Sequence, residues 1–88
     1  MATTSDVQDF VLSAVRCLVD NPENIKLESI EHEGGTTLRL QVSREDVGKI
    51  IGRQGRTARS IRIILHATGL KLKRKISLDI VETDMSRG

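Results

Sequence analysis

The chain has 88 residues, a formal net charge of +2 and one cysteine. This length gives one small domain with a single core, no segment approaches the roughly 18 apolar residues of a membrane span, and the first residues do not resemble a secretory signal. Cys17 alone cannot form an internal disulfide or a cysteine metal cluster. We therefore expect a cytoplasmic protein with no membrane association, no metal and no cofactor.

The charges are segregated along the chain. Residues 1–43 hold three Lys or Arg against seven acids, residues 44–75 hold ten against two, and residues 76–88 hold one against three. The three segments therefore carry net charges of −4, +8 and −2. A basic segment of this kind is typical of nucleic-acid binding, although a solvated basic face without a ligand gives the same pattern.

The first element is predicted to be a helix over residues 5–20. Apolar residues recur along it at helical spacing, Ser5 with Gln8 has the form of a capping box, and the Pro22 that follows disfavours a longer helix. Cys17 borders the apolar stripe. We expect it to pack as a small apolar residue rather than to act as a reactive thiol.

Two strands are predicted next, over residues 25–31 and 36–42, and the four residues between them form the turn of an antiparallel hairpin. Ile30 breaks the alternation of the first strand, which predicts a bulge or an early strand end there. His32 and Glu33 in the turn could be pictured as an acid–base pair or as metal ligands. Without a third ligand nearby, exposed polar residues are the better interpretation.

The second half predicts a short helix, a two-glycine turn, a longer helix and a last strand. Ser43 and Asp46 have the form of another capping box at the start of the short helix. Gly69 is expected to end the longer helix near Thr68, and an alternating strand follows over residues 76–80. The apolar residues of the longer helix that fall at helical spacing are Ala58, Ile61, Ile64, Leu65 and Thr68 with its methyl group.

The predicted order is α-β-β-α-α-β. Helices can cover one face of a three-stranded mixed sheet, so we expect a two-layer α+β domain with three helices on one face. The domain is expected to span residues 1–82. Residues 83–88 show no periodicity and are interpreted as a flexible tail.

The two-glycine turn is the segment Gly52-Arg53-Gln54-Gly55. Glycine has no Cβ and lets a ligand backbone approach closely, and the helix that begins here offers free backbone N–H groups and a positive dipole end. Arg53 lies in the turn, and Arg56, Arg59 and Arg62 lie on the next helical turns. The pattern predicts a site for a polyanion backbone. The alternative is a tight helix–helix turn with no ligand.

Around this turn the sequence resembles the I-G-x-x-G-x-x-x-x-x-I core of a KH domain, through Ile51, Gly52, Gly55 and Ile61. The predicted element order is similar to that of type II, bacterial KH domains. The resemblance extends over residues 5–81. A bare G-x-x-G is weak evidence, whereas its combination with flanking isoleucines, basic loop residues and this element order is specific.

The resemblance implies non-enzymatic binding of single-stranded RNA. In this family the loop clamps the backbone of about four nucleotides, and the bases lie in an adjacent aliphatic groove. Carried over, Gly52 and Gly55 permit close approach, while Arg53 and Gln54 face the sugar–phosphate chain. The further expected RNA-binding residues are Lys49, Arg56 and Arg59 for phosphates and Val42, Ile50, Ile51 and Ile61 for the groove floor.

The resemblance also implies partners and a cellular role. Similar small single-KH proteins act as homodimers or with a larger KH-containing protein of the Jag/EloR type, and two grooves on one assembly would raise affinity. The implied role is that of a post-transcriptional regulator or RNA chaperone. A protein–protein adaptor and a single-stranded DNA binder that uses the same groove remain alternatives.

Other classes fit the residues less well. The chain has no Trp or Tyr and only one Phe, which argues against readers that stack bases on exposed aromatic side chains. A helix-turn-helix does not explain the hairpin and the last strand. His32 and His66 are the only histidines, and no nucleophile motif, metal spacing or Walker pattern occurs. We therefore expect no catalytic residues.

Overall fold

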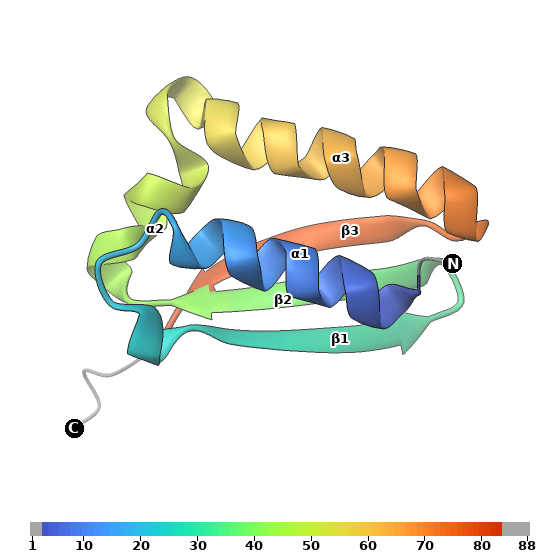
Figure 1. Ribbon diagram of the computed structural model, residues 1–88, viewed down its shortest axis with the longest axis horizontal. Coiled ribbons are helices and arrows are strands. Elements are labelled where there is room, and N and C mark those ends of the chain that lie inside the picture. The colour runs from blue at the N-terminus through green and yellow to red at the C-terminus, as the bar shows by residue number, and fades with distance from the viewer. Residues whose placement is uncertain (1–2, 84–88) are drawn as a thin grey trace.

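The computed structural model describes residues 3–83, and its element order confirms the predicted α-β-β-α-α-β arrangement (Figure 1). Short 3₁₀ turns lie between α1 and β1 and between α2 and α3. The elements are α1 (Thr4–Arg16), η1 (Pro22–Asn24), β1 (Lys26–His32), β2 (Gly35–Val42), α2 (Arg44–Ile51), η2 (Arg53–Gly55), α3 (Arg56–Leu72) and β3 (Ile76–Glu82).

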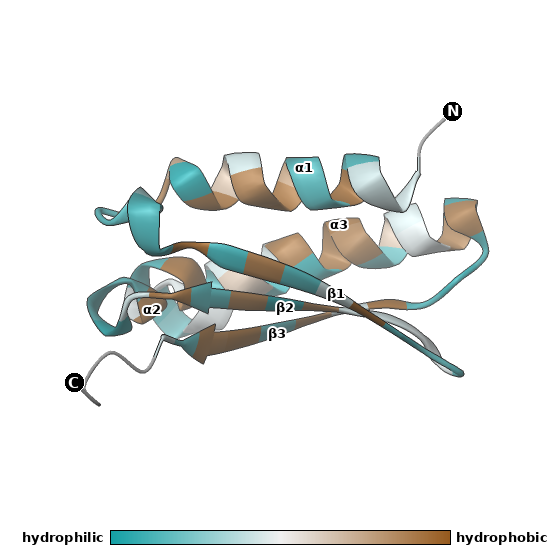
Figure 2. Cartoon of the chain, turned by 90° about the horizontal axis from the view of Figure 1, so that it is seen from below, coloured by the Kyte–Doolittle hydropathy of each residue, from teal (hydrophilic) through white to brown (hydrophobic). Residues whose placement is uncertain are grey.

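The sheet is mixed, as predicted, and β2 is its central strand. β1 pairs with β2 antiparallel, whereas β3 pairs with β2 parallel. Parallel neighbours need a crossover connection, and here the crossover consists of α2, the two-glycine loop and α3. The helices lie on one face of the sheet (Figures 1 and 2), which makes the expected two-layer α+β domain.

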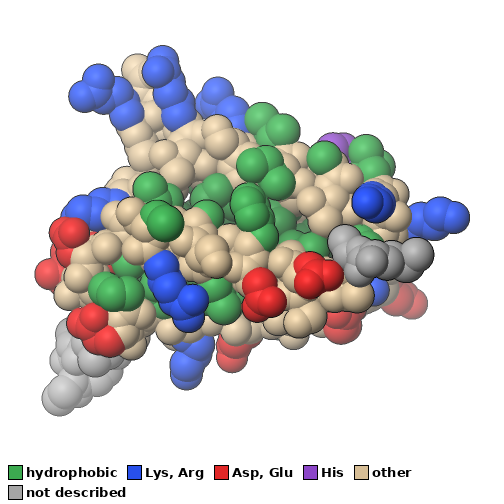
Figure 3. All heavy atoms as spheres, viewed as in Figure 1, with side chains coloured by type: hydrophobic (Ala, Val, Ile, Leu, Met, Phe, Trp, Pro, Cys, Tyr) green, Lys and Arg blue, Asp and Glu red, His purple; other side chains and the backbone are tan. Residues whose placement is uncertain are grey.

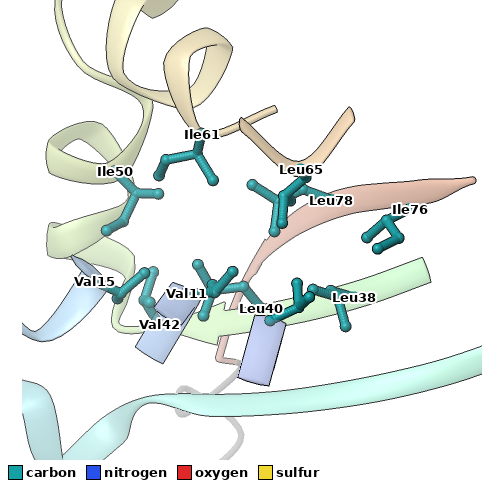
Figure 4. Packing of buried hydrophobic residues seen from close by; sticks show 11 residues of the cluster. Val11, Val15, Leu38, Leu40, Val42, Ile50, Ile61, Leu65, Ile76 and Leu78 are labelled. Atoms are coloured by element: carbon teal, nitrogen blue, oxygen red, sulfur yellow. The ribbon is translucent and has the colours of Figure 1, made fainter. Parts of the chain in front are cut away.

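The core lies between the helices and the sheet. In Figure 4 the labelled side chains of the helices and of the strands point toward one another across this layer. Alternate residues of β2 face inward, as the sequence predicts, because a central strand covered by helices must bury one of its faces. The buried apolar cluster consists of Val7, Val11, Val15, Leu38, Leu40, Val42, Ile50, Ile61, Leu65, Ile76 and Leu78.

The first helix is shorter than predicted and has a different cap. It ends at Arg16, and its N-cap is Thr3 rather than Ser5. The Thr3 hydroxyl accepts from the Asp6 N–H at 3.3 Å, and the Asp6 carboxylate accepts from the Thr3 N–H at 2.9 Å. The prediction that Cys17 packs as a small apolar residue was also wrong. Cys17 is the C-terminal cap of α1 and is exposed.

The hairpin contains no bulge. β1 and β2 pair without interruption along the whole of β1, and Ile30 lies opposite Thr37. Ile30 is half-buried on the sheet face away from Leu27, so the break in alternation reflects apolar residues on both faces of an edge strand. The turn consists of Glu33 and Gly34 only, and His32 and Glu33 are exposed, as predicted.

The start of α2 uses its polar residues differently from the predicted capping box. Ser43 makes no side-chain cap. The carboxylate of Asp46 is fully buried and accepts from the Asp20 N–H at 3.1 Å, the Asn21 N–H at 3.0 Å and the Asn21 Nδ2 at 3.1 Å. Asp46 therefore joins α2 to the segment after α1, which a local sequence pattern cannot indicate.

The end of α3 also differs from its prediction. The helix continues to Leu72, and Gly69 is a buried residue inside it. A Cβ on Gly69 would lie 2.4 Å from the Arg74 carbonyl oxygen, so the glycine allows close packing instead of ending the helix. Lys73, with φ +61°, is the C-terminal cap that follows the helix. The Arg74 N–H donates to Gly69 O at 2.9 Å and the Lys73 N–H to Leu70 O at 3.3 Å, which is a Schellman motif.

The last strand is longer than predicted and ends at Glu82. The Thr83 N–H donates to Val42 O at 2.8 Å, so the first residue assigned to the tail follows the sheet. Residues 84–88, the rest of the predicted tail, lie outside the described residues. Among residues 3–83, no helix has the length and apolar character needed to cross a bilayer.

Candidate nucleic-acid interface

The two-glycine loop lies where α2 meets α3, at one corner of the molecule (Figure 1). The Gly52 N–H donates to Gly48 O at 2.8 Å and ends α2, and the Gly55 N–H donates to Gly52 O at 3.1 Å and closes the turn. Gly52, Gln54 and Gly55 have φ values of +79°, +57° and +74°. Three positive φ angles within four residues make a compact turn, in which Arg53 and Gln54 are exposed and the two glycines are half-buried.

The two glycines are required for different reasons. Gly52 combines φ +79° with ψ 172°, a region that only glycine populates readily. A Cβ there would lie 2.3 Å from Thr57 Oγ1 and 2.9 Å from the Thr57 backbone nitrogen. Gly55 has left-handed helical angles, and a Cβ on it would point into open space. The fold therefore requires glycine at position 52, whereas the absence of a side chain at position 55 keeps the space outside the loop open.

The start of α3 offers hydrogen-bond donors to a ligand. Gly55 is its N-cap and provides no side-chain acceptor; the Arg56 N–H donates to Arg53 O, and the N–H groups that follow have no side-chain cap. These groups, together with the positive end of the helix dipole, attract an anion. The site thus combines an exposed turn with the uncapped N-terminus of a 17-residue helix.

Three predicted phosphate ligands surround this turn. Arg53, Arg56 and Arg59 are exposed, and within residues 3–83 none of them forms an ion pair. Figure 3 shows Lys and Arg side chains projecting from the corner where Figure 1 places the loop. The positive charge at this corner is therefore available to an external anion.

Lys49 lies in a different electrostatic setting. Its Nζ is 3.2 Å from an Asp20 carboxylate oxygen and 3.7 Å from Asp46 Oδ1. The hydrogen bond to Asp20 and the negative charges of Asp20 and Asp46 raise the pKa of Lys49, although partial burial acts in the opposite direction. Burial opposes ionisation of Asp46, but hydrogen bonds from Asp20 and Asn21, together with Lys49, hold the pKa of Asp46 below its usual value. The structure thus places Lys49 in a cluster that joins α2 to the segment after α1.

The four predicted floor residues separate into two groups. Val42, Ile50 and Ile61 are buried in the core. Ile51 is 39% exposed and immediately precedes the loop. The structure therefore brings one of the four to the surface beside the predicted phosphate site, while the other three support that surface from below.

Sequence reasoning missed the roles of two residues on α3. The guanidinium of Arg62 donates to Leu78 O at 3.2 Å and ties α3 to β3. Ile64, which the sequence groups with the apolar residues at helical spacing, is 45% exposed. The run from Ile61 to Leu65 contains too many apolar residues to face inward together, and that excess is the signal that could have identified Ile64.

Neither histidine belongs to a catalytic arrangement in the described part of the chain. His32 Nε2 lies 2.9 Å from Thr37 Oγ1, its Nδ1 accepts from the Gly34 N–H, and His66 is exposed on α3. Within residues 3–83, no three His, Cys, Asp or Glu side chains are placed to hold a metal ion.

A two-layer α-β-β-α-α-β domain with a G-x-x-G loop between its second and third helices defines the class of type II KH domains. Residues 8–80 match the family model for the KhpA/KhpB KH domain, and the chain belongs to this family.

Several curated relatives cover most of the chain. RNA-binding protein KhpA of Listeria monocytogenes is 42% identical over 76 residues, which are 86% of this chain and 100% of the relative. The protein of the same name from Borreliella burgdorferi is 50% identical over 68 residues, 77% and 83% of the two chains. That from Bacillus subtilis is 36% identical over 80 residues, 91% and 99% of the two chains. All three are named as RNA-binding proteins, and none is named as an enzyme.

Proposed function

We propose that this chain is a non-enzymatic RNA-binding protein of the cytoplasm whose Gly52–Gly55 loop holds about four nucleotides of single-stranded RNA. The observation that carries the proposal is the loop itself. It places an exposed turn and the uncapped start of α3 beside three arginines that form no ion pair within residues 3–83. Phosphates are the anions that such an arrangement binds well.

Each loop residue has a separate task in this proposal. Gly52 lets the chain turn, and Gly55 keeps the outer side of the turn open to the sugar–phosphate backbone. Arg53 and Gln54 project from the middle of the turn and contact that backbone, while Arg56 and Arg59 contact neighbouring phosphates. Bases lie against the adjoining aliphatic surface, where Ile51 is accessible.

The relatives support RNA as the ligand, because those from three bacteria carry the name RNA-binding protein KhpA. We extend that ligand to this chain together with a role as post-transcriptional regulator or RNA chaperone. Single-stranded DNA in the same groove is the second candidate ligand. A loop that contacts backbone and base faces does not itself require the 2′-hydroxyl that distinguishes RNA.

A titration of a fluorescent ten-nucleotide oligo-uridine at several salt concentrations tests the proposal. Arg53→Asp/Gln54→Asp should abolish binding while circular dichroism shows an intact fold, because two acids in the loop repel phosphate. Ser13→Glu/Arg16→Glu on α1 changes the net charge equally and should bind almost as the wild type does. Equal binding by the loop variant would contradict the proposal. Equal affinity for oligo-deoxythymidine would favour a general single-strand binder.

The partner is proposed to be a second copy of the chain. Figure 3 shows hydrophobic side chains gathered between α3 and α1, and Phe10 on α1 and Ile64 on α3 are 41% and 45% exposed. Exposed large apolar residues that cluster on one face are typical of interaction surfaces. The family description, which pairs KhpA with KhpB, supports a KhpB-type protein, the Jag/EloR-type partner, as the other candidate for the same face.

A further inference from the structure

A second basic region lies at the opposite end of α3 from the loop. A cavity of about 330 Å³ opens there, between the last turns of α3 and the start of β3. Figure 3 shows Lys and Arg side chains at the end of the molecule where Figure 1 places the C-terminus of α3. The residues of this end pocket that matter here are His66, Leu70, Lys73, Arg74, Lys75 and Ile76.

The pocket combines available positive charge with apolar surface. Arg74 is paired with Glu31. Lys73 and Lys75 are exposed and form no ion pair within residues 3–83. Leu70, at 68% exposure, supplies a large apolar side chain beside them. Ammonium groups next to an apolar wall suit a nucleotide, whose phosphate is charged and whose base is a flat apolar surface.

The backbone of Lys73 gives an independent indication. Its φ of +61° lies in the left-handed region, at the position after a helix where glycine is strongly favoured. A lysine there strains the backbone but places a long cationic side chain at the mouth of the pocket. Gln54 in the loop, with φ +57°, is the other positive-φ residue that is not glycine within residues 3–83. Strained residues of this kind concentrate at binding sites.

One side of α3 connects the loop to the pocket. Arg59, Ile63, His66 and Leu70 recur every three or four residues and are all exposed, so they follow a single stripe along the helix. Seventeen residues make α3 about 25 Å long. At the rise of about 3.4 Å per nucleotide in a stacked strand, about seven nucleotides cover that length.

We propose that this stripe is a continuous track for single-stranded RNA, which extends the binding site beyond the four nucleotides at the loop. Lys73 and Lys75 contact phosphates at the far end, and Leu70 packs against a base there. The inference rests on the proposed function, because the strand must first be held by the loop.

Binding of four- and ten-nucleotide oligo-uridines tests the track. Lys73→Gly/Lys75→Gln removes both charges, and glycine at position 73 suits the backbone, so the fold should persist. We expect a loss of about tenfold for the longer RNA and less than twofold for the shorter one. The salt dependence of log K for the longer RNA should become shallower by about 1.4, the value for two lost phosphate contacts on a single strand.

The control variant is Lys26→Gln/Lys71→Gln, which removes the same charge from outside the pocket. It should weaken both RNAs slightly and equally. The ten-nucleotide RNA offers several overlapping positions for the loop. Their number is the same for every variant, so it does not affect the ratio of affinities between variant and wild type. An equal loss in the control, or an unchanged affinity of the pocket variant for the longer RNA, would overturn the track and leave the loop proposal standing. If the wild type bound neither RNA, the proposed function would fail and the track with it.

Discussion

At the scale of single residues, the loop shows that two glycines three positions apart need not be equivalent. The spacing of Gly52 and Gly55 predicted the turn correctly, since few other residues allow such a tight connection between helices. It could not indicate that Thr57 packs against Gly52, because that contact depends on how α3 leaves the turn.

This difference predicts unequal effects of substitution. Gly52→Ala should lower the free energy of unfolding by about 2–3 kcal/mol, because its backbone angles exclude other residues and the new Cβ meets Thr57. Gly55→Asn should lower it by less than about 1 kcal/mol, because asparagine tolerates left-handed angles. Urea denaturation measures both values. Similar losses in the two variants would contradict the distinct roles assigned to them.

At the scale of elements, the sequence predicted the three α-helices and three strands of the described residues but misplaced several of their ends and did not predict the two 3₁₀ turns. The periodicity of apolar residues sufficed for the number, type and order of the elements, because each element must bury one face. The ends depend on contacts between distant segments. Gly69 was predicted to end the helix, but it lies inside α3, where the absence of a side chain lets the Arg74 carbonyl oxygen pack against it. Asp46 was predicted to cap α2, but its carboxylate accepts hydrogen bonds from the backbone after α1.

The Asp46 contacts predict a dependence of stability on pH. The pKa of Asp46 is lowered in the folded protein, so its ionised form stabilises the fold. That stabilisation is fully present above the unfolded pKa of 3.8 and is lost as the pH falls through the lower folded value.

Asp46→Asn should therefore reduce the Tm at pH 7, and the difference from the wild type should narrow below pH 3.8. Thermal melts followed by circular dichroism at pH 7 and at several values below pH 4 measure this difference. Asp79→Asn on β3 is the control for loss of an exposed carboxylate. A difference that stays constant across this range would show that the charge of Asp46 contributes nothing to stability.

At the scale of the whole molecule, the two-layer architecture leaves the loop corner, the end pocket and the helix layer accessible at the same time. The sequence predicted the basic half and the loop, because charge and glycine spacing are local properties. The exposure of Ile64 and the burial of Val42, Ile50 and Ile61 emerge only when the helices are placed on the sheet. Side chains of similar chemistry then divide between core and surface.

The exposed apolar side chains of α1 and α3 predict a dimer that can be disrupted without loss of the fold. Ile64→Glu should convert a dimer into a monomer, because a charge at the centre of an apolar contact would be desolvated without a partner. Sedimentation equilibrium over a range of concentrations measures the mass. Lys26→Glu, at an exposed position of β1 away from α1 and α3, is the control. A wild-type protein that remains monomeric at high micromolar concentration would contradict the dimer.

The hydrogen bond from Gly55 to Gly52 fixes the number of residues in the loop. Insertion of one residue would break this hydrogen bond and change the backbone path that the positive φ angles of Gly52, Gln54 and Gly55 produce, so Arg53 would no longer lie in the same place relative to the start of α3. The side chains of Arg53 and Gln54 are exposed and can vary without disturbing the core, provided that the residue at position 54 tolerates a φ of +57°. The loop therefore combines a fixed backbone with two exposed positions, 53 and 54. Substitutions at these two positions can change ligand preference while the fold stays the same.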